Sequence, residues 1–228
     1  MCSGTRGSAL EICDFGAGMI TAFIRVESRP FVVIGNNPKH LGGAIDADAG
    51  DKAARFLQLC DAFDIPIISL CDTPGFMIRP EAEKTALVRH VVRMFVTCAS
   101  LTVPLFGVVL RKGCGLGAQS VLGGGFQASF FTVAWPTGEF GGMGLEGYVR
   151  LGFRMEMEAI ADPSEREKCY QHKVAQLYAS GKVSIAIVME IDEVIGPAET
   201  RNYIMAGLRS TPEPEKRTHR RRPCIDTW

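Results

Sequence analysis

Short apolar runs alternate along the chain with longer segments in which apolar residues recur every three or four positions. A short apolar run bounded by polar residues predicts a strand that is buried in a sheet. Runs of this kind cover residues 16–25, 30–35, 65–71, 104–110 and 130–135. The first alternates loosely and is joined to the second by the turn Glu27-Ser28-Arg29-Pro30, so these two runs are expected to form a hairpin.

The segments with helical periodicity predict helices at residues 51–63, 81–99, 146–160 and 164–180, followed by a mostly helical end at 192–208. Ser164 is the expected N-cap of the fourth helix. The apolar face of the first helix consists of Ala53, Phe56, Leu57, Cys60 and Phe63. That of the second consists of Leu87, Val88, Val91, Val92, Phe95 and Cys98. We expect both faces to pack on the sheet.

The order of the elements predicts an α/β protein with mostly parallel strands. The runs at 65–71, 104–110 and 130–135 are each followed by a loop and a helical segment. Repeated units of this kind give parallel strands covered by helices, with the functional loops at the carboxyl ends of the strands. Candidate chemistry is therefore sought in those loops.

The stretch from Arg111 to Ala118 is such a loop, and glycines occupy positions 113, 115 and 117. Glycine permits backbone conformations that are closed to other residues, and the N–H groups at the start of the next helix attract negative charge. The stretch therefore suits an oxyanion hole, in which each donor is worth about 3–4 kcal/mol. Two alternatives remain open, a connector that packs a helix on the sheet and a nucleotide site. The Rossmann spacing and the Gly-Lys-Ser/Thr ending are both absent.

Composition narrows the class of protein. The chain has 228 residues, 46% of them hydrophobic, and no net charge, which suits a globular domain and argues against a broad nucleic-acid surface. It has neither an apolar run of the ~20 residues that cross a bilayer nor a signal-peptide core, so no membrane contact and a cytoplasmic location are expected. We expect one domain over residues 1–210 and a solvated basic tail over 211–228.

The eight cysteines make no Cys-x-x-Cys pair and lie mostly within apolar runs. This pattern favours buried free thiols over disulfides or zinc ligands, and no metal is expected in the chain.

Several motifs, in this order, are specific enough to identify a relative. They are Asn37-Pro38, His40 to Asp46, Asp51 to Phe56, Cys60 to Phe63, Asp72-Thr73-Pro74-Gly75-Phe76, Arg111-Lys112, Gly117-Ala118 and Ala134-Trp135-Pro136-Thr137. With them the chain resembles the C-terminal half of the carboxyltransferase component of biotin-dependent acyl-CoA carboxylases, of the propionyl-CoA carboxylase β-subunit type. The resemblance implies a crotonase-like (ClpP/crotonase) fold, in which ββα units wind into a superhelix.

The resemblance also implies roles for individual residues. Gly117 and Ala118 match the catalytic oxyanion-hole pair, whose backbone N–H groups hold the biotin enolate as carboxybiotin gives up its carboxyl group. Gly75, Phe76, Cys114 and Gly115 match the biotin-binding loops, with the ring of Phe76 shielding biotin from water. A valine at position 117 is then expected to block the site while leaving the fold mostly intact.

Two positions depart from many relatives. Cys114 stands where many carry a tyrosine, and Gln119-Ser120 stands where many carry Tyr-Asp, the Asp being linked to the choice of acyl chain. Cys114 is interpreted as a small apolar filler rather than a nucleophile, because no histidine lies in the loop. Gln119 and Ser120 are interpreted as acyl-pocket residues, and Ser120 predicts tolerance of acyl chains longer than propionyl.

The function implied is transfer of a carboxyl group from carboxybiotin to the α-carbon of a short or medium acyl-CoA. Biotin would be carried on a separate biotin carrier protein, loaded by a biotin carboxylase. A second, acyl-CoA-binding half would complete the site, so the chain is expected to oligomerise or to require a partner. Two alternatives stay open: a biotin-dependent acyl-CoA decarboxylase subunit, and a truncated, non-catalytic copy that acts as an assembly module.

Overall fold

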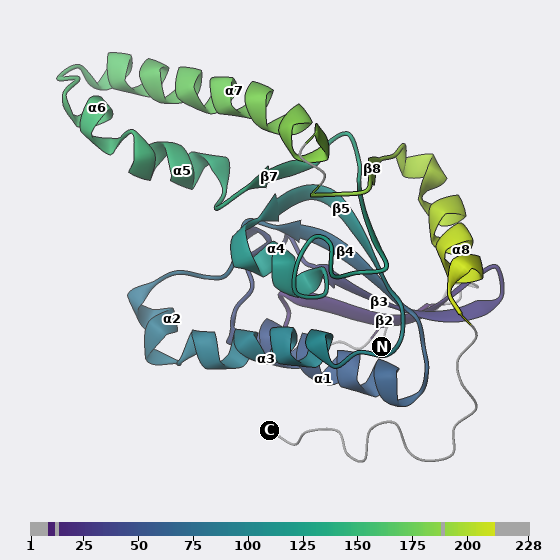
Figure 1. The fold of residues 1–228 in the computed structure, drawn as a ribbon. Helices are drawn as coiled ribbons and strands as arrows, with labels where there is room; N and C mark the ends of the chain where they lie inside the picture. The colour runs from purple at the N-terminus through teal and green to yellow at the C-terminus, as the bar shows by residue number, and fades with distance from the viewer. Residues whose placement is uncertain (1–8, 12–13, 188–189, 213–228) are drawn as a thin grey trace.

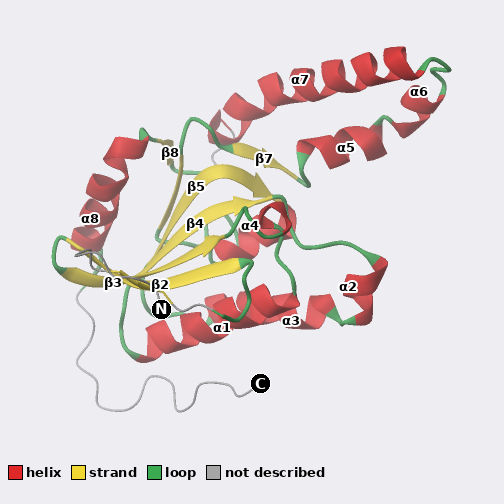
Figure 2. Cartoon of the chain, turned by 180° about the vertical axis from the view of Figure 1, so that it is seen from behind, coloured by secondary structure: helices red, strands yellow, loops and turns green. Residues whose placement is uncertain are grey.

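A computed structural model describes residues 9–11, 14–187 and 190–212. These residues form an eight-stranded mixed sheet in the order β1-β2-β3-β4-β5-β6-β8, with β7 paired to the end of β5 (Figures 1 and 2). The strands are β1 Ala9–Glu11, β2 Met19–Val26, β3 Arg29–Asn36, β4 Ile67–Thr73, β5 Leu105–Cys114, β6 Phe131–Ala134, β7 Glu139–Gly141 and β8 Glu193–Val194. The predicted hairpin is confirmed as β2–β3, which pair antiparallel, as do β1 and β2. From β3 onward the neighbouring strands are parallel, also as predicted.

Helices cover both faces of this sheet. They are α1 Ala47–Ala62, α2 Pro80–Lys84, α3 Leu87–Ala99, α4 Gly115–Val121, α5 Leu145–Gly152, α6 Arg154–Glu158, α7 Pro163–Ile187 and α8 Thr200–Ser210, with 3-10 turns at Leu41–Gly43 and Pro197–Glu199. Figure 1 shows α1 and α3 along one face, α8 on the other and α4 beside the ends of β4 and β5. The helices α5 to α7 project away from the sheet as an arm.

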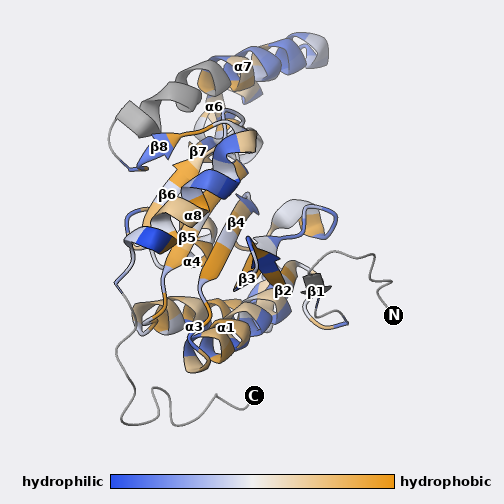
Figure 3. Ribbon diagram, turned by 90° about the vertical axis from the view of Figure 1, so that its right-hand side faces the viewer, coloured by the Kyte–Doolittle hydropathy of each residue, from blue (hydrophilic) through white to orange (hydrophobic). Residues whose placement is uncertain are grey.

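Alternation along the strands explains the two packed faces. In β3, Val32 and Ile34 belong to the large core under α1 and α3, whereas Phe31 packs with Ile204 and Met205 of α8. In β4 and β5, Ile68 and Phe106 join the α8 side. Because both faces are buried, the central strands are almost uniformly hydrophobic, as Figure 3 shows.

The predicted helix at 81–99 is wrong as a single element. Ala86 has a φ of 55°, in the left-handed region, and separates α2 from α3. The predicted core stripe of α3 is also too wide, because Val88 and Val92 are 60% and 44% exposed. The buried stripe of α3 consists of Leu87, Val91, Met94, Thr97 and Cys98.

Other helix ends differ from the prediction as well. The first helix begins at Ala47, because the side chain of Asp46 accepts a hydrogen bond from the Ala49 N–H and caps it, and the predicted core residue Phe63 is 67% exposed beyond its end. Ser164 is not an N-cap, since α7 begins at Pro163 and the carboxylate of Asp162 accepts from the Ser164 N–H at 3.0 Å.

Two further segments are divided. The predicted helix at 146–160 is split into α5 and α6, and the segment at 192–208 contains β8 and a 3-10 turn before α8. Among the described helices, none is long and apolar enough to cross a membrane. The predicted basic tail at 211–228 lies outside the described residues from position 213 onward.

Candidate functional site

The glycine-containing stretch is the junction of a strand and a helix rather than a loop. The strand β5 continues through Gly113 to Cys114, and α4 begins directly at Gly115. Gly115 has a φ of 59°, and a Cβ built there would lie 2.7 Å from the carbonyl oxygen of Gly142. A side chain at position 115 is therefore excluded both by conformation and by space.

Gly117 and Ala118 are both buried in the first turn of α4. The first residues of a helix have N–H groups without an intrahelical partner, and Gly117 is among them. The N–H of Ala118, one residue later, is the first in α4 that has an intrahelical acceptor, the carbonyl of the N-cap residue Cys114.

The first turn of α4 lies directly against the peptide between Gly75 and Phe76. A Cβ built at Gly117 would lie 2.7 Å from both the Cα and the carbonyl carbon of Gly75 and 3.0 Å from the Phe76 nitrogen. Two glycine motifs that are 42 positions apart in the sequence (75 and 117) thus meet at the carboxyl ends of β4 and β5.

This contact corrects the expectation that a valine at 117 leaves the fold intact. Since real Cβ atoms almost never approach backbone atoms this closely, any side chain at position 117 must displace α4 or the Gly75–Phe76 segment. The glycine is required by close backbone packing.

Hydrogen bonds fix the Gly75–Phe76 segment. The Gly75 N–H donates to the hydroxyl oxygen of Thr73, which in turn donates to the Gly75 carbonyl, both at 3.1 Å. Ile45 N–H donates to the same carbonyl at 3.1 Å, and Met77 N–H donates to the Ile45 carbonyl at 2.9 Å. Gly75 has a φ of 125°, which favours glycine, so the turn after β4 is held from both sides.

The ring of Phe76 is partly buried against the core. Its centroid lies 6.4 Å from that of Phe95 in α3, in an edge-to-face arrangement. The ring therefore packs on α3, and the residue as a whole is only partly buried.

The cysteine prediction is confirmed for four thiols. Cys60, Cys71, Cys98 and Cys114 are free and buried, whereas Cys169 is only partly buried and Cys2, Cys13 and Cys224 lie outside the described residues. Burial raises the pKa of Cys60 and of Cys98 to about 12, and that of Cys71 still further. Cys114 is 2% exposed, which agrees with the interpretation as a filler. Nowhere in the described chain are three His, Cys, Asp or Glu side chains grouped to hold a metal.

Gln119 and Ser120 follow the glycine turn within α4. Ser120 is fully buried; its hydroxyl donates to the Gly117 carbonyl at 2.8 Å, and its own carbonyl lies 3.7 Å from the thiol of Cys98. Gln119 is partly exposed. The hydroxyl of Ser120 is thus satisfied within its own helix, in the layer between α4 and α3.

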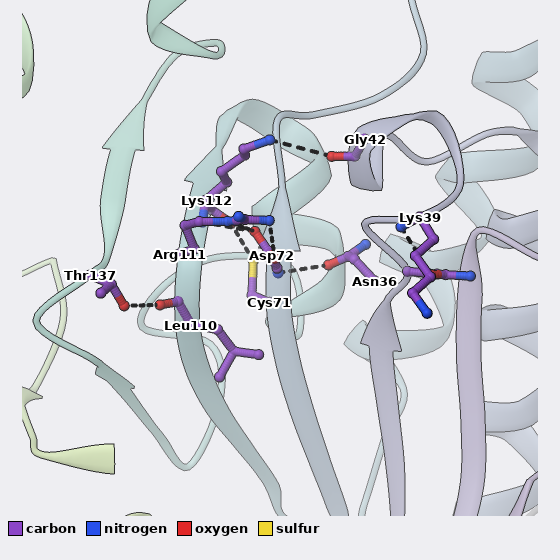
Figure 4. A network of polar contacts seen from close by, with 10 residues as sticks. Asn36, Lys39, Gly42, Cys71, Asp72, Leu110, Arg111, Lys112 and Thr137 are labelled. Carbon is purple, nitrogen blue, oxygen red and sulfur yellow. Dashed lines mark hydrogen bonds and ion pairs between the residues drawn. The ribbon is translucent and has the colours of Figure 1, made fainter.

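A polar network at the strand ends was not predicted as functional, although three of its residues, Asp72, Arg111 and Lys112, belong to motifs that carry the resemblance. Figure 4 shows Asp72, at the end of β4, between Arg111 of β5 and Asn36 of β3. The carboxylate of Asp72 accepts from Nη2 of Arg111 at 3.0 Å, from its Nε at 3.3 Å and from the Lys112 N–H at 3.2 Å. The hydrogen bond to Asp72 raises the pKa of the Arg111 guanidinium above its usual value. The sequence signal is an acidic residue at the end of a buried strand.

His40 is the histidine of the motif loops. Its Nε2 lies 2.8 Å from the carboxylate of Asp46, which also caps α1. This pair ties the His40 to Asp46 loop to the start of α1.

The chain is similar to known proteins in both sequence and structure. The sequence profile of the carboxyl transferase domain matches residues 8–224. The chain is 34% identical over 200 residues to the propionyl-CoA carboxylase carboxyltransferase subunit of Haloferax mediterranei, a match that covers 86% of this chain and 38% of that protein. It is 34% identical over 207 residues to the methylmalonyl-CoA carboxyltransferase 12S subunit of Propionibacterium freudenreichii subsp. shermanii, with 89% and 38% covered.

Solved structures are also similar. A single-chain, multi-domain long-chain acyl-CoA carboxylase matches with a TM-score of 0.82 and 53% identity, over 88% of this chain and 20% of that one. The hexameric transcarboxylase 12S, solved with methylmalonyl-CoA and methylmalonic acid bound, matches with a TM-score of 0.77 and 31% identity, over 95% and 42%. This chain thus spans less than half the length of these relatives.

The predicted fold class is confirmed by these structures, which are carboxyltransferases with the crotonase-like fold. The chain belongs to the carboxyl transferase domain family of the acyl-CoA carboxylases.

Proposed function

We propose that this chain is the carboxybiotin-binding half of an acyl-CoA carboxyltransferase. The observation that carries the proposal is the contact between the first turn of α4 and the Gly75–Phe76 peptide, where Gly117 approaches Gly75 to a distance that no side chain allows. Two backbone segments with constrained glycines meet there at the carboxyl ends of parallel strands, which is where α/β proteins bind ligands.

The residues present fit the ureido carbonyl of biotin. Such a group needs N–H donors and an apolar surface for the ring system. The N–H of Gly117 would supply one donor, and the N–H of Ala118, shared with the Cys114 carbonyl, would supply a second. Phe76 together with Leu116, which is 61% exposed, would supply the apolar surface. Gly75, Gly115 and Cys114 shape the backbone around this turn and add no polar side chain other than a buried thiol.

The proposed transfer needs this chain to position biotin and to supply N–H dipoles, and it needs no acidic or basic side chain from it. Carboxybiotin, delivered by a carrier protein, would supply the carboxyl group that is transferred. The first-turn N–H groups of α4 would hold the carbonyl oxygen on which negative charge develops, an effect worth about 3–4 kcal/mol per donor. The partly exposed ring of Phe76 would exclude water from one side.

The acyl-CoA would be bound by a second half that this chain does not contain. The relatives are more than twice as long as this chain, and the transcarboxylase 12S is described as a hexamer with a coenzyme A thioester bound. Exposed apolar side chains support association, since Val88, Val92 and Val96 form a stripe along α3, and Leu151 and Met155 of the arm are 65% and 85% exposed.

The same arrangement would serve a biotin-dependent decarboxylase, because the oxyanion contact acts in both directions of transfer. The carboxylase direction is proposed because the similar proteins are named carboxylases and carboxyltransferases. The long-chain substrate in the name of the structure with 53% identity agrees with the proposal that the acyl chain can exceed propionyl.

A ligand titration of the chain tests the proposal. Free biotin and, separately, propionyl-CoA are added to isotope-labelled chain while backbone amide resonances are recorded. We expect biotin to cause saturable shifts at Gly75, Phe76, Gly117 and Ala118, and propionyl-CoA to cause none there. Saturable shifts with propionyl-CoA instead would identify the chain as the acyl-CoA-binding half. No saturable shift with either ligand, in a chain with dispersed resonances, would refute the proposed site.

A further inference from the structure

The pairing of β4 with β5 is interrupted just before the candidate site. Cys71 pairs with Val109, and the next pair joins Thr73 to Gly113. One residue of β4, Asp72, therefore faces three residues of β5, namely Leu110, Arg111 and Lys112. This is a bulge in a parallel pair, a rare feature that bends a strand and turns its side chains in a new direction.

The side chain of Asp72 replaces the ladder hydrogen bonds that the bulge removes. Its Oδ1 accepts from the Lys112 N–H at 3.2 Å and from Arg111 Nε at 3.3 Å, and its Oδ2 accepts from Arg111 Nη2 at 3.0 Å. The Asp72 side chain is 11% exposed, whereas that of Arg111 is 50% exposed. The nearly buried carboxylate of Asp72 thus finds its hydrogen-bond donors within the bulge, on Arg111 and Lys112.

Neighbouring groups hold the bulge at its other atoms. The Asp72 N–H donates to Oδ1 of the buried Asn36 at 3.1 Å, which fixes the carboxylate from the side of β3. The hydroxyl of Thr137 donates to the Leu110 carbonyl at 2.5 Å, and the Cys71 thiol lies 3.6 Å from the Lys112 carbonyl. Lys112 Nζ lies 3.5 Å from the Gly42 carbonyl, so the 3-10 turn is attached as well (Figure 4).

The bulge also changes the partner of β5. Before it, Phe106 to Val109 pair with β6, and from its last residue onward, Lys112 to Cys114 pair with β7. The residue that ends this second pairing, Cys114, is the one before α4. The position of the first turn of α4 relative to Gly75 therefore depends on the conformation of residues 110–112, which the hydrogen bonds of Asp72 hold in place.

We propose that Asp72 and Arg111 are a positioning pair that closes the β5 bulge and thereby sets the first turn of α4 against Gly75–Phe76. This rests on the proposed function for its catalytic consequence, but its structural part stands on the geometry alone. Asp72 acts through Arg111 and the Lys112 N–H and is not expected to touch biotin.

The test uses the Asp72→Asn variant, which keeps the shape of the side chain and removes its charge. Hydrogen exchange followed by mass spectrometry is measured on the full chain. We expect exchange at least about tenfold faster in residues 110–118 and 74–77, with little change in residues 67–70 and 105–109. The reason is that the substitution loosens only the end of the β4–β5 pairing that lies beside α4.

Two companion variants sharpen the result. Arg111→Lys keeps the charge but loses the two-pronged contact, so it should give an intermediate effect. The double variant Asp72→Asn plus Arg111→Gln should exchange no faster than Asp72→Asn alone, because both substitutions break the same contact, the one between Asp72 and Arg111. The matched control is Glu158→Gln, which removes the exposed ion pair with Arg154 on the arm and should leave both regions unchanged.

The catalytic consequence is measured in a complex completed with an acyl-CoA-binding half. Asp72→Asn should lower kcat at least about tenfold and leave KM for the acyl-CoA unchanged, because the acyl-CoA site is on the other half. A rise in KM with unchanged kcat would overturn the positioning role.

Exchange in Asp72→Asn that is unchanged, or that accelerates equally throughout the sheet, would overturn the structural part. If the wild-type complex transfers no carboxyl group, the proposed function fails, and the exchange result still decides whether the pair closes the bulge.

Discussion

At the scale of single residues, Ser120 has no free hydrogen-bonding capacity to offer a substrate through its proton. Its hydroxyl donates to the Gly117 carbonyl inside a fully buried layer. Any influence of this position on acyl-chain choice would therefore act through the shape of α4, and Ser120→Asp cannot serve as a simple specificity switch.

We predict that Ser120→Asp lowers the free energy of unfolding by roughly 3 kcal/mol or more, since it places a carboxyl group in a dry layer facing a carbonyl oxygen. Urea unfolding measures this. Gln119→Glu, at a partly exposed position of the same helix, is the control and should change stability little. Equal stability of Ser120→Asp and wild type would contradict the buried, satisfied hydroxyl.

The buried thiols predict a loss of stability at alkaline pH. Burial raises the pKa of Cys60 and Cys98 to about 12, whereas an unfolded thiol titrates near 8.5. Above that lower value the unfolded state releases protons that the folded state retains, so stability is full below about pH 8.5 and falls as pH rises toward 12.

Denaturant midpoints measured from pH 7 to 11 test this, and replacing Cys60 and Cys98 by alanine should flatten the dependence while lowering stability at neutral pH. An unchanged slope in the double variant would show that other groups cause the alkaline loss.

At the scale of elements, the break between α2 and α3 is set by one residue. Ala86 has a φ of 55° and precedes the first residue of α3. An alanine in this conformation is strained by about 1 kcal/mol or somewhat more, and glycine is not.

We therefore predict that Ala86→Gly raises the free energy of unfolding by up to about 1 kcal/mol, measured by urea unfolding. Ala82→Gly, within α2, should lower it. Destabilisation of Ala86→Gly equal to that of Ala82→Gly would mean that the two short helices do not separate at Ala86.

Much of the arrangement of elements is predictable from the sequence, and the failures have physical reasons. The β2–β3 hairpin and the parallel strands follow from apolar runs and one turn. The strands β7 and β8 have three and two residues and carry no periodicity that would reveal them. The break at Ala86 has no glycine or proline to mark it.

The candidate site, like the fold, was predictable only in part. The glycines at 75, 115 and 117 mark constrained backbone in the sequence, and the resemblance placed them in one site. The bulge at 110–112 could not be predicted, because it depends on the register of β4 against β5 and on a side chain 39 positions away. Because Arg111 and Lys112 are polar, the sequence pattern predicted that the strand ends at Leu110, whereas β5 continues to Cys114.

At the scale of the whole molecule, the outer face of α3 and the projecting arm are two of the parts that carry exposed apolar side chains. The inner side of the arm is already packed, since Arg150 lies over the ring of Tyr170 and Lys173 over that of Phe153, at 5.3 and 4.1 Å from the ring centroids. Its exposed side is thus available to another chain.

We predict that the isolated chain self-associates, because a stable interface buries about 1,200–2,000 Å² and apolar stripes supply such area. Sedimentation velocity over a range of concentrations measures this, and the Val88→Ser plus Val92→Ser variant should weaken association without lowering the denaturant midpoint. A monomer at all concentrations, identical in both proteins, would contradict this use of α3.

The central claim is that the α4 turn and Gly75–Phe76 together hold the group from which the carboxyl is transferred. The most direct measurement is transfer of a radiolabelled carboxyl group from a carboxylated biotin carrier to propionyl-CoA, in a complex completed with an acyl-CoA-binding half. Gly117→Ala adds one methyl group where Gly75 lies 2.7 Å from the new Cβ, whereas Gly125→Ala adds it where no atom lies within 4 Å. The account predicts that Gly117→Ala, still folded by circular dichroism, loses at least about a hundredfold in kcat, while Gly125→Ala transfers at the wild-type rate. Wild-type turnover in Gly117→Ala would contradict it.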